Sequence, residues 1–372
     1  MRFTIERSGL LKSLSHVQNV VERRNTIPIL SNVLLQATGG KLTLTATDLD
    51  TEIIEIIDAD VVTEGGTTAP AHLLYEIVRK LPDGAQVDIE YVQDDQRLHV
   101  KGGRSRFTLA CLPRDDFPEM SAGDLPVQFA LEAKDLARVI DKTRFAISNE
   151  ETRYYLNGIY MHAATDDGNV LRAVATDGHR LARYELPLPA GAEDMPGIIV
   201  PRKAVNEIRK LIDDGAGTVE VALSDTKIRF EFDGIVLTSK LIDGTFPDYN
   251  RVIPQGNDKS LILHGSDFAH AVDRVATISD ERKSRAVKLN IEEDRMTLTV
   301  VNPESGNATE ELAVEYGAGP IEVGFNANYL LDITRQLDGE QAQFLLADPG
   351  SPTIVRDMED ERALYVLMPM RV

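Results

Sequence analysis

The sequence predicts an α+β chain of three similar domains, each with two helices backed by antiparallel sheets. The basis is three sets of matching segments, which recur in the same order about 130 residues apart. A period of that length is a whole domain rather than a solenoid unit of about 20–50 residues. The segments are Phe3-Thr-Ile-Glu, Phe129-Ala-Leu-Glu and Leu261-Ile-Leu-His; Ala46-Thr-Asp, Ala175-Thr-Asp and Val301-Asn-Pro; and Ala69-Pro-Ala-His, Val200-Pro-Arg-Lys and Phe325-Asn-Ala-Asn.

The first half of the first copy predicts a strand, a helix and a hairpin. A short alternating strand includes Phe3 and Ile5, which share one face. A helix with Ser8 as its expected N-cap follows, because apolar residues then repeat at helical spacing. These residues are Leu10, Leu14, Val17 and Val21. Strands at residues 32–36 and 41–47 flank Gly39-Gly40, which predicts a tight turn.

The second half of the copy predicts another helix and further strands. The helix has the apolar residues Leu73, Leu74, Ile77, Val78 and Leu81, and it ends at Pro82 and Gly84. Strands are expected at residues 87–91, 98–101 and 106–111. The predicted domains are residues 1–126, 127–254 and 255–372, joined by short polar connectors at 120–125 and 255–259.

The composition is that of an ordinary globular protein, with 42% hydrophobic residues and a net charge of −20. No apolar run is long enough to span a membrane and no leader segment is evident, so we expect a cytoplasmic protein. The single Cys111 is interpreted as a buried thiol. So acidic a chain repels nucleic acid unless its positive charges gather on one surface.

Basic residues recur at matching positions on the predicted polar faces of both helices. We expect these positions to point to solvent. An ordinary solvated face balanced by acids is the alternative for any single residue. The matched sets are Lys12, Arg138 and His270; His16, Lys142 and Arg274; Arg79, Lys210 and Arg335; and His72, Lys203 and Asn328.

A shared basic face predicts a ring. If two chains joined, twelve helices at about 9 Å spacing would leave a hole of roughly 25 Å, which admits duplex DNA. Contacts would then go to phosphates, without base readout and with strong salt dependence.

Four segments give the chain a resemblance to a known family, the bacterial DNA polymerase III β subunit or sliding clamp, over its whole length. They are Arg153-Tyr-Tyr-Leu-Asn-Gly158, Ala175-Thr-Asp-Gly-His-Arg-Leu181, Thr238-Ser-Lys-Leu with Phe246-Pro-Asp-Tyr249, and the terminal Tyr365-Val-Leu-Met-Pro-Met-Arg-Val372.

The resemblance implies a head-to-tail homodimer whose six domains encircle double-stranded primer-template DNA and tether the replicative polymerase. It further implies no catalysis, no cofactor and no metal. The implied partners are the polymerase III α subunit, the clamp-loader δ subunit, translesion polymerases, mismatch-repair proteins and ligase. The implied location is the cytoplasm, at the nucleoid.

The resemblance also implies a pocket for short peptides of partner proteins. Apolar side chains would hold a leucine or phenylalanine anchor, and methionines would adapt to related peptides. The implied residues are Leu156, Thr176, Gly178, His179, Arg180, Leu181, Pro247, Val252, Asn326, Tyr329, Val366, Met368, Pro369, Met370, Arg371 and Val372.

DNA contacts and a dimer seam are implied in the same way. The DNA contacts are Arg24, His72, Tyr154, Tyr155, Arg202 and Lys203. Glu150 is left out, because it stands where a well-known relative has an amide and a carboxylate repels phosphate. The seam would join edge strands at residues 104–109 and 295–301, and its residues are Arg104, Arg106, Phe107, Leu109, Ile278 and Glu304.

Two other classes of protein fit less well. A hydrolase is disfavoured because no nucleophile elbow, phosphate-loop lysine motif or zinc motif occurs, and the Asp177 and His179 pair is absent from the other copies. A peptide-binding adaptor without DNA would carry the pocket in all three copies and no recurring basic positions.

Overall fold

The computed structural model describes residues 1–23, 26–121, 123–165, 168–212, 217–279 and 285–371. The chain folds as two compact units. Unit 1 comprises Met1–Ala137, Pro189–Pro196 and Lys203–Leu241, and unit 2 comprises Arg138–Leu188, Gly197–Arg202 and Ile242–Val372. The division passes through helix α3 (Ala133–Thr143) and the start of α4 (Arg202–Ile212).

Unit 1 contains two antiparallel sheets. The five-stranded sheet has the order β5-β1-β7-β8-β9, with β5 at Asp60–Thr63, β1 at Arg2–Glu6, β7 at Gln86–Val92, β8 at Arg97–Gly102 and β9 at Ser105–Ala110. The eight-stranded sheet has the order β10-β15-β16-β17-β4-β3-β2-β6. Its strands are β10 (Val127–Glu132), β15 (Thr218–Leu223), β16 (Lys227–Phe232), β17 (Ile235–Lys240), β4 (Thr51–Asp58), β3 (Lys41–Thr47), β2 (Asn32–Thr38) and β6 (Gly65–Pro70).

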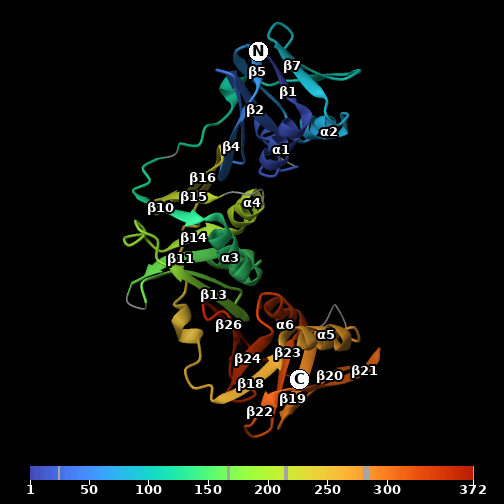
Figure 1. The fold of residues 1–372 in the computed structure, drawn as a ribbon, viewed down its shortest axis with the longest axis vertical. Coiled ribbons are helices and arrows are strands. Elements are labelled where there is room, and N and C mark those ends of the chain that lie inside the picture. The colour runs from blue at the N-terminus through green and yellow to red at the C-terminus, as the bar shows by residue number, and fades with distance from the viewer. Residues whose placement is uncertain (24–25, 122, 166–167, 213–216, 280–284, 372) are drawn as a thin grey trace. The chain divides into compact units, whose positions relative to one another are not determined.

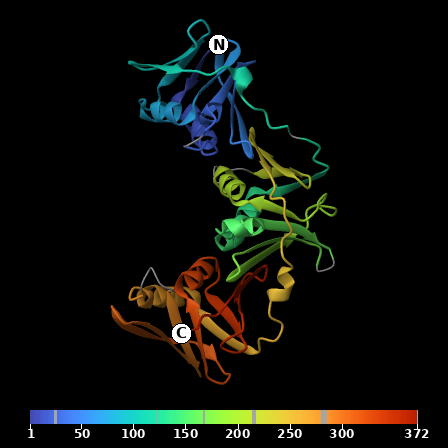
Figure 2. The same ribbon diagram turned by 180° about the vertical axis from the view of Figure 1, so that it is seen from behind.

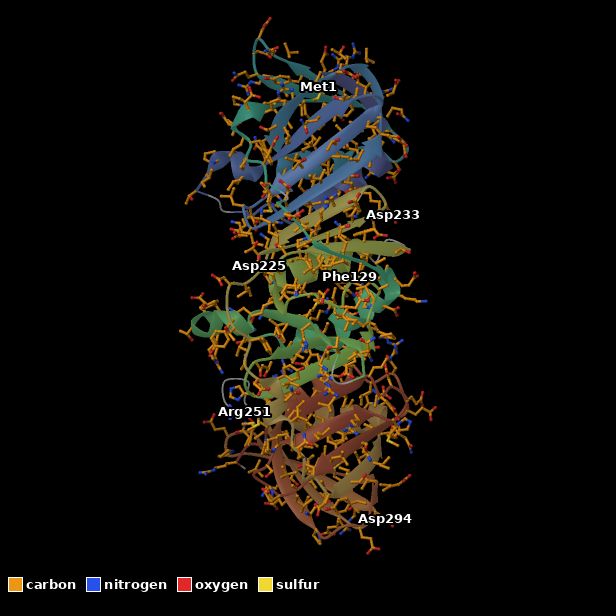
Figure 3. All side chains as sticks on the ribbon, turned by 90° about the vertical axis from the view of Figure 1, so that its left-hand side faces the viewer. Met1, Phe129, Asp225, Asp233, Arg251 and Asp294 are labelled. Carbon is orange, nitrogen blue, oxygen red and sulfur yellow. The ribbon has the colours of Figure 1, made fainter. Side chains whose placement is uncertain are left out.

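Two helices of unit 1, α1 (Arg7–Val17) and α2 (Ala71–Lys80), lie side by side against its strands (Figure 1). Leu10, Leu14 and Val17 of α1 are fully buried, as their spacing predicts. Figure 3 shows Asp225 and Asp233 in the turns at the two ends of β16. Short 3-10 turns, η1 (Pro28–Ser31) and η2 (Arg114–Asp116), complete the unit.

Unit 2 also contains two antiparallel sheets. The nine-stranded sheet has the order β14-β11-β12-β13-β26-β25-β24-β18-β22. Its strands are β14 (Ile198–Pro201), β11 (Gly158–Ala164), β12 (Val170–Thr176), β13 (Arg180–Pro187), β26 (Ala363–Leu367), β25 (Thr353–Asp357), β24 (Gln341–Leu346), β18 (Lys259–His264) and β22 (Glu315–Tyr316). The four-stranded sheet comprises β21 (Gly306–Ala313), β20 (Arg295–Asn302), β19 (Ala286–Glu292) and β23 (Ile321–Asn326), in that order.

Helices α5 (Gly265–Ala276) and α6 (Ala327–Thr334) pack against each other in unit 2, as the view from behind also shows (Figure 2). Three 3-10 turns lie around the nine-stranded sheet: η3 (Arg144–Ala146), η4 (Glu151–Leu156) and η5 (Tyr249–Val252).

The two large sheets each join strands from two predicted domains. Strand β4 of the first predicted domain pairs with β17 of the second, and Thr51 lies opposite Ser239. Strand β13 of the second pairs with β26 of the third, and Arg180 lies opposite Leu367. The next backbone hydrogen bond along each strand pair also matches. Lys240 N donates to the Asp50 carbonyl in one sheet, and Met368 N donates to the His179 carbonyl in the other. The two junctions therefore share one register.

Four expectations about individual residues are wrong. His16 and Lys142 were expected to face solvent, but both are buried, because each has a carboxylate partner that the helix pattern does not reveal. Leu73 was expected in the core, but it is 50% exposed. Ser8 does not cap α1; Glu6 is the N-cap residue, and the Ser8 hydroxyl donates to its carboxylate.

Candidate functional site

An apolar cluster of unit 2 lies where β13 pairs with β26. The cluster covers one face of the nine-stranded sheet and is closed by the segment that follows β17. The Phe246 ring stacks on Tyr160 with centroids 4.8 Å apart and an interplanar angle of 4°. The buried members are Leu156, Val174, Leu181, Ile199, Phe246, Tyr249, Ile354, Leu364 and Val366.

The turn between β12 and β13 forms the polar wall beside this cluster. The Asp177 carboxylate accepts from the amides of His179 and Arg180, at 2.9 Å and 3.0 Å. The Thr176 hydroxyl donates to the Arg180 carbonyl at 2.6 Å and accepts from the Gly178 amide. Side chains thus satisfy the turn's own backbone groups, which holds the turn in one conformation.

Gly178 lies at the tip of this turn, where glycine is favoured. Its φ of +87° lies in the left-handed region, which glycine adopts at little cost. A Cβ there would also lie 2.6 Å from Arg153 Nη1. Arg153 makes two hydrogen bonds to Glu150, whose pKa is lowered mainly by that contact. Glu150 therefore has a cation partner within the chain.

Arg180 is the best-anchored side chain at the wall. It donates to Asp177 Oδ2 at 3.1 Å, to Asp332 Oδ2 of α6 at 2.6 Å and to the Phe145 carbonyl at 2.7 Å. Its guanidinium carbon lies 4.5 Å from the centre of the Tyr329 ring, which is a cation–π distance. Burial raises the pKa of the Tyr329 phenol, so this ring stays neutral at physiological pH.

The end of the chain forms the other side of the site. Met370 N donates to the Gly324 carbonyl at 2.8 Å, which ties the end of the chain to β23. Pro369, Met370 and Arg371 line a hollow of about 580 Å³ together with Glu322–Gly324 and the Pro349-Gly350 turn. Met368 is 39% exposed between this hollow and the β12–β13 turn.

The structure brings the implied pocket residues together in unit 2. Leu156, Leu181 and Val366 are nearly fully buried in the apolar cluster, whereas Gly178, His179, Pro247, Val252 and Met368 are exposed. The partly exposed ones are Thr176, Arg180, Asn326, Tyr329, Pro369 and Met370. Arg371 is exposed, and Val372 lies outside the described residues.

Sequence reasoning missed several contributors to the site. Asp332 and Phe145 hold Arg180, and Tyr160 stacks on Phe246, but none of them stands in a recognisable motif. Of these residues, only Phe246 lies in one of the four segments that carry the family resemblance. The remaining signal in the sequence is that Phe145, Tyr160 and Phe246 are all aromatic.

The positions that correspond to this apolar cluster are polar at the junction in unit 1. The shared register places Glu52 at the position of Leu181, Thr238 at that of Val366 and Thr45 at that of Val174. The turns also match, because Asp48 Oδ1 accepts from the Asp50 and Thr51 amides as Asp177 does in unit 2. Burial raises the pKa of Glu52. An apolar anchor side chain would therefore be disfavoured at this junction.

The implied DNA-contacting residues are already engaged within the chain. Both ring nitrogens of His72 have partners, Gln18 Oε1 at 2.9 Å and the Val21 carbonyl at 3.0 Å. Lys203 binds Asp48 and the Val20 carbonyl in unit 1. Arg202 binds Asn149 and the Ser148 carbonyl in unit 2, and burial lowers its pKa. Their contact with DNA stays a prediction.

The remaining members of this set are aromatic or lie outside the described residues. Tyr154 is 53% exposed and meets Tyr155 edge-on at 5.8 Å. Tyr155 packs against the apolar cluster, so it has a packing role whatever else it contacts. Arg24 is outside the described part of the chain.

Exposed cations of the matched helix positions pair with nearby acids. Arg274 binds Glu310, Arg79 binds Glu76 and Lys210 binds Glu207. Such pairing weakens the field of a basic face without removing its hydrogen-bond donors. The alternative of a solvated face balanced by acids thus applies to these three positions.

The expectation that residues 295–301 form an edge strand at one side of the dimer seam is wrong. Residues 295–301 belong to β20, which lies between β19 and β21, so they are not at an edge; the edge strands of that sheet are β21 and β23. Residues 104–109, on the other side, fall mainly in β9 (Ser105–Ala110), which is an edge strand as expected. Arg104, Arg106 and Glu304 are exposed, and Phe107 and Ile278 are partly exposed, whereas Leu109 is already buried inside unit 1.

The described residues contain no group of three or more His, Cys, Asp or Glu side chains that could hold a metal ion. Within the same residues, none of the helices is sufficiently long and apolar to cross a membrane.

Three family models match the chain in order, and all describe the DNA polymerase III β subunit. The N-terminal domain matches residues 1–121, the central domain residues 130–248 and the C-terminal domain residues 250–371. The chain belongs to the DNA polymerase III β subunit family. The resemblance seen in the sequence and the three-domain α+β fold class are therefore confirmed.

The chain is similar to individual β sliding clamps over its whole length. The protein from Caulobacter vibrioides is 58% identical over 373 residues, and the one from Escherichia coli is 39% identical over 375 residues; both alignments cover 100% of each chain. The crystal structure of the Caulobacter crescentus clamp has a TM-score of 0.98 at 58% identity and covers 100% of this chain and 99% of that one. The Bartonella birtlesii clamp bound to griselimycin has a TM-score of 0.97 at 51% identity, with full coverage of both chains.

Membership of this family establishes the function. The protein acts as a β sliding clamp, the processivity factor of DNA polymerase III, and it is a non-catalytic subunit. Family membership implies DNA and a polymerase as its partners and a ring as its assembly.

Proposed function

We propose that the groove between the β12–β13 turn and the end of the chain binds short peptide motifs of replication and repair proteins. The observation that supports this is an apolar floor between a braced polar turn and exposed methionine. A leucine or phenylalanine would rest on Leu181 and Val366, while Arg180 and His179 orient the peptide backbone. Met368 and Met370 adapt to peptides of different sequence.

The proposed partners are the polymerase III α subunit, the clamp-loader δ subunit, translesion polymerases, mismatch-repair proteins and ligase. All of them would compete for one groove per chain, because the equivalent floor in unit 1 carries Glu52 and Thr238. The protein would act in the cytoplasm, at the nucleoid where its DNA lies.

A matched pair of methionine variants tests the groove. Met368 is 39% exposed inside it, and Met358 is 45% exposed outside it. Met368→Ser should weaken binding of a fluorescent pentapeptide with leucine and phenylalanine anchors by about tenfold, whereas Met358→Ser should not change it. Fluorescence anisotropy measures both affinities. Equal affinity for the two variants would place the peptide elsewhere.

We also propose that β9 of one chain pairs with β21 of a partner, in the register of the two internal junctions. Asp58 pairs with Lys41 in the first repeat as Ala313 pairs with Arg295 in the third, which aligns β4 with β21. The turns of the β8–β9 and β16–β17 hairpins align β9 with β17. Because Thr238 lies opposite Glu52, Thr108 would lie opposite Asn307 of the partner.

This register changes the expected ion pairs of the seam. It places Arg104 opposite Glu311 and Arg106 diagonal to it, about two residues along the strand. Glu311 is exposed and lies 3.7 Å from Arg295 of its own chain. We therefore propose Glu311, rather than Glu304, as the acid that Arg104 and Arg106 share. Phe107 and Ile278 supply apolar contact, and closure removes both open strand edges.

Engineered disulfides distinguish this register from others. Cysteines replacing Thr108 and Asn307 should cross-link two chains on oxidation, because directly opposite residues have Cβ atoms about 4.5–5.5 Å apart. The diagonal pair Thr108→Cys with Thr309→Cys should cross-link poorly. Non-reducing electrophoresis measures the covalent dimer, and preferential linkage of the diagonal pair would refute the register.

Arg24, His72, Tyr154, Tyr155, Arg202 and Lys203 are proposed to contact the phosphates of duplex DNA inside the ring. The support is that His72 lies on α2 and that Arg202 and Lys203 lie on α4, two of the helices that carry the recurring basic residues. Contacts of this kind are independent of sequence and fall steeply with salt. The affinity of the protein for a linear duplex should decrease less steeply with salt in Lys203→Gln, since one phosphate contact is lost. An unchanged slope would exclude this contact.

A further inference from the structure

Arg180 is held between two segments that are remote in the sequence. One is η3, whose Phe145 carbonyl accepts from Arg180 Nη2, and its ring centre lies 5.1 Å from the guanidinium carbon. The other is α6, whose Asp332 accepts from Nη1 and whose Tyr329 ring also faces the guanidinium. The position of Arg180 in the groove therefore depends on the spacing between η3 and α6.

Lys142 joins the same two segments behind the groove. It lies three residues before Phe145, at the end of α3, and its ammonium donates to the Gln336 carbonyl and to Asp338 Oδ2, the latter at 2.9 Å. Gln336 lies two residues beyond the end of α6 and donates from its side chain to the Asp332 carbonyl. The Lys142 side chain is only 5% exposed, and an ammonium so buried requires partners in fixed positions.

The acceptors of Lys142 are themselves fixed. The Asp338 amide donates to Asp357 Oδ2 of β25 at 2.7 Å. Arg138, one turn earlier on α3, binds Asp338 as well and lies 3.6 Å from Asp360. The contact is thus part of a network that joins α3 to β25 and to the segment between β25 and β26, and not an isolated surface pair.

We propose that Lys142 is a positioning residue for the peptide groove, which sets the distance between η3 and α6 and so holds Arg180 in its binding conformation. This inference rests on the proposed groove. It assigns a function to a lysine whose helical position alone suggested a solvent-exposed DNA contact. Without the ammonium, Asp338 would pair with Arg138 alone, and the Gln336 carbonyl would lose its contact with Lys142. We then expect η3 and α6 to separate, so that Arg180 loses its contacts with one of these two segments.

A double-mutant cycle on the full chain tests the proposal. Lys142→Met keeps the stem of the side chain but removes the ammonium, and Lys134→Met on the exposed face of the same helix is the control. Lys142→Met should weaken binding of the fluorescent leucine–phenylalanine pentapeptide by about tenfold, with no change for Lys134→Met. If Lys142→Met is too unstable to purify, Asp338→Asn is measured in its place, with an expected loss of about threefold.

The cycle with Arg180→Lys separates positioning from general destabilisation. If Lys142 acts through Arg180, the double variant should bind the peptide about as weakly as Arg180→Lys alone. Additive losses would show that Lys142 affects the groove independently of Arg180 and would overturn the proposal. Full affinity in Lys142→Met would also overturn it. If instead Arg180→Lys itself bound normally, the proposed groove would be wrong, which is a distinct result.

Discussion

Replacing Gly178 by alanine tests the geometry of the β12–β13 turn most sharply. The backbone there has a φ of +87°, and a Cβ would lie 2.6 Å from Arg153 Nη1. The left-handed conformation costs an L-residue about 1–2 kcal/mol, of which about 0.4–1 kcal/mol is offset because alanine has less freedom than glycine in the unfolded chain. Displacing Arg153 from Glu150 breaks an exposed pair worth at most about 1 kcal/mol.

Taking the middle of each range, the sum is a loss of about 1 kcal/mol. For a folding unit of this size it should lower the midpoint of thermal unfolding by roughly 2–4 °C. Differential scanning calorimetry measures this midpoint for the wild type, Gly178→Ala, Arg153→Ala and the double variant. In the Arg153→Ala background the steric part disappears, so Gly178→Ala should then cost less.

The corresponding turn of unit 1 shows why the cost is not backbone strain alone. Leu49 occupies the position of Gly178 with a φ of +78°, so a turn of this kind accepts a side chain at a positive φ. An equal loss on changing Gly178 to alanine with and without Arg153 would refute the steric argument. No loss in either background would refute the whole estimate.

Three further predictions concern single side chains. Phe246→Ala removes a buried ring stacked on Tyr160, which should cost about 3–5 kcal/mol in unfolding free energy, measured with denaturant, and should weaken peptide binding. Lys203→Met leaves Asp48 without its ammonium partner and should lower stability by about 1–2 kcal/mol even without DNA; an unchanged melting temperature would argue against a structural role. The folded pKa of Glu52 is raised by burial, so this group destabilises the fold as pH rises through its ordinary pKa and the raised value. Glu52→Gln should therefore melt higher than the wild type at pH 7 and differ less at pH 4, and the opposite trend would contradict the burial argument.

Much of the fold follows from periodic patterns in the sequence. The strand at residues 41–47 and the buried Leu10, Leu14 and Val17 stand where alternation and helical spacing place them. The edge strand β21 escaped prediction because Gly306–Ala313 carries polar and acidic residues with little apolar alternation. None of its side chains is fully buried, so this strand needs few apolar residues.

The site was predictable where it is local and unpredictable where it is not. The Thr176–Arg180 turn is a contiguous motif, so its residues were recognised together. The burial of Lys142 depends on Gln336 and Asp338, which are distant in sequence and act partly through a backbone carbonyl. A carbonyl acceptor has no side-chain signature, which also explains why Phe145 was missed.

The most direct test of the ring is retention on DNA of different topology. The clamp is loaded onto nicked circular DNA, and the complex is isolated by gel filtration before and after one restriction cut in the circle. If the ring encircles DNA without sequence-specific contacts, we expect stable retention on the circle and rapid loss from the linear product. Equal retention on both forms would contradict it.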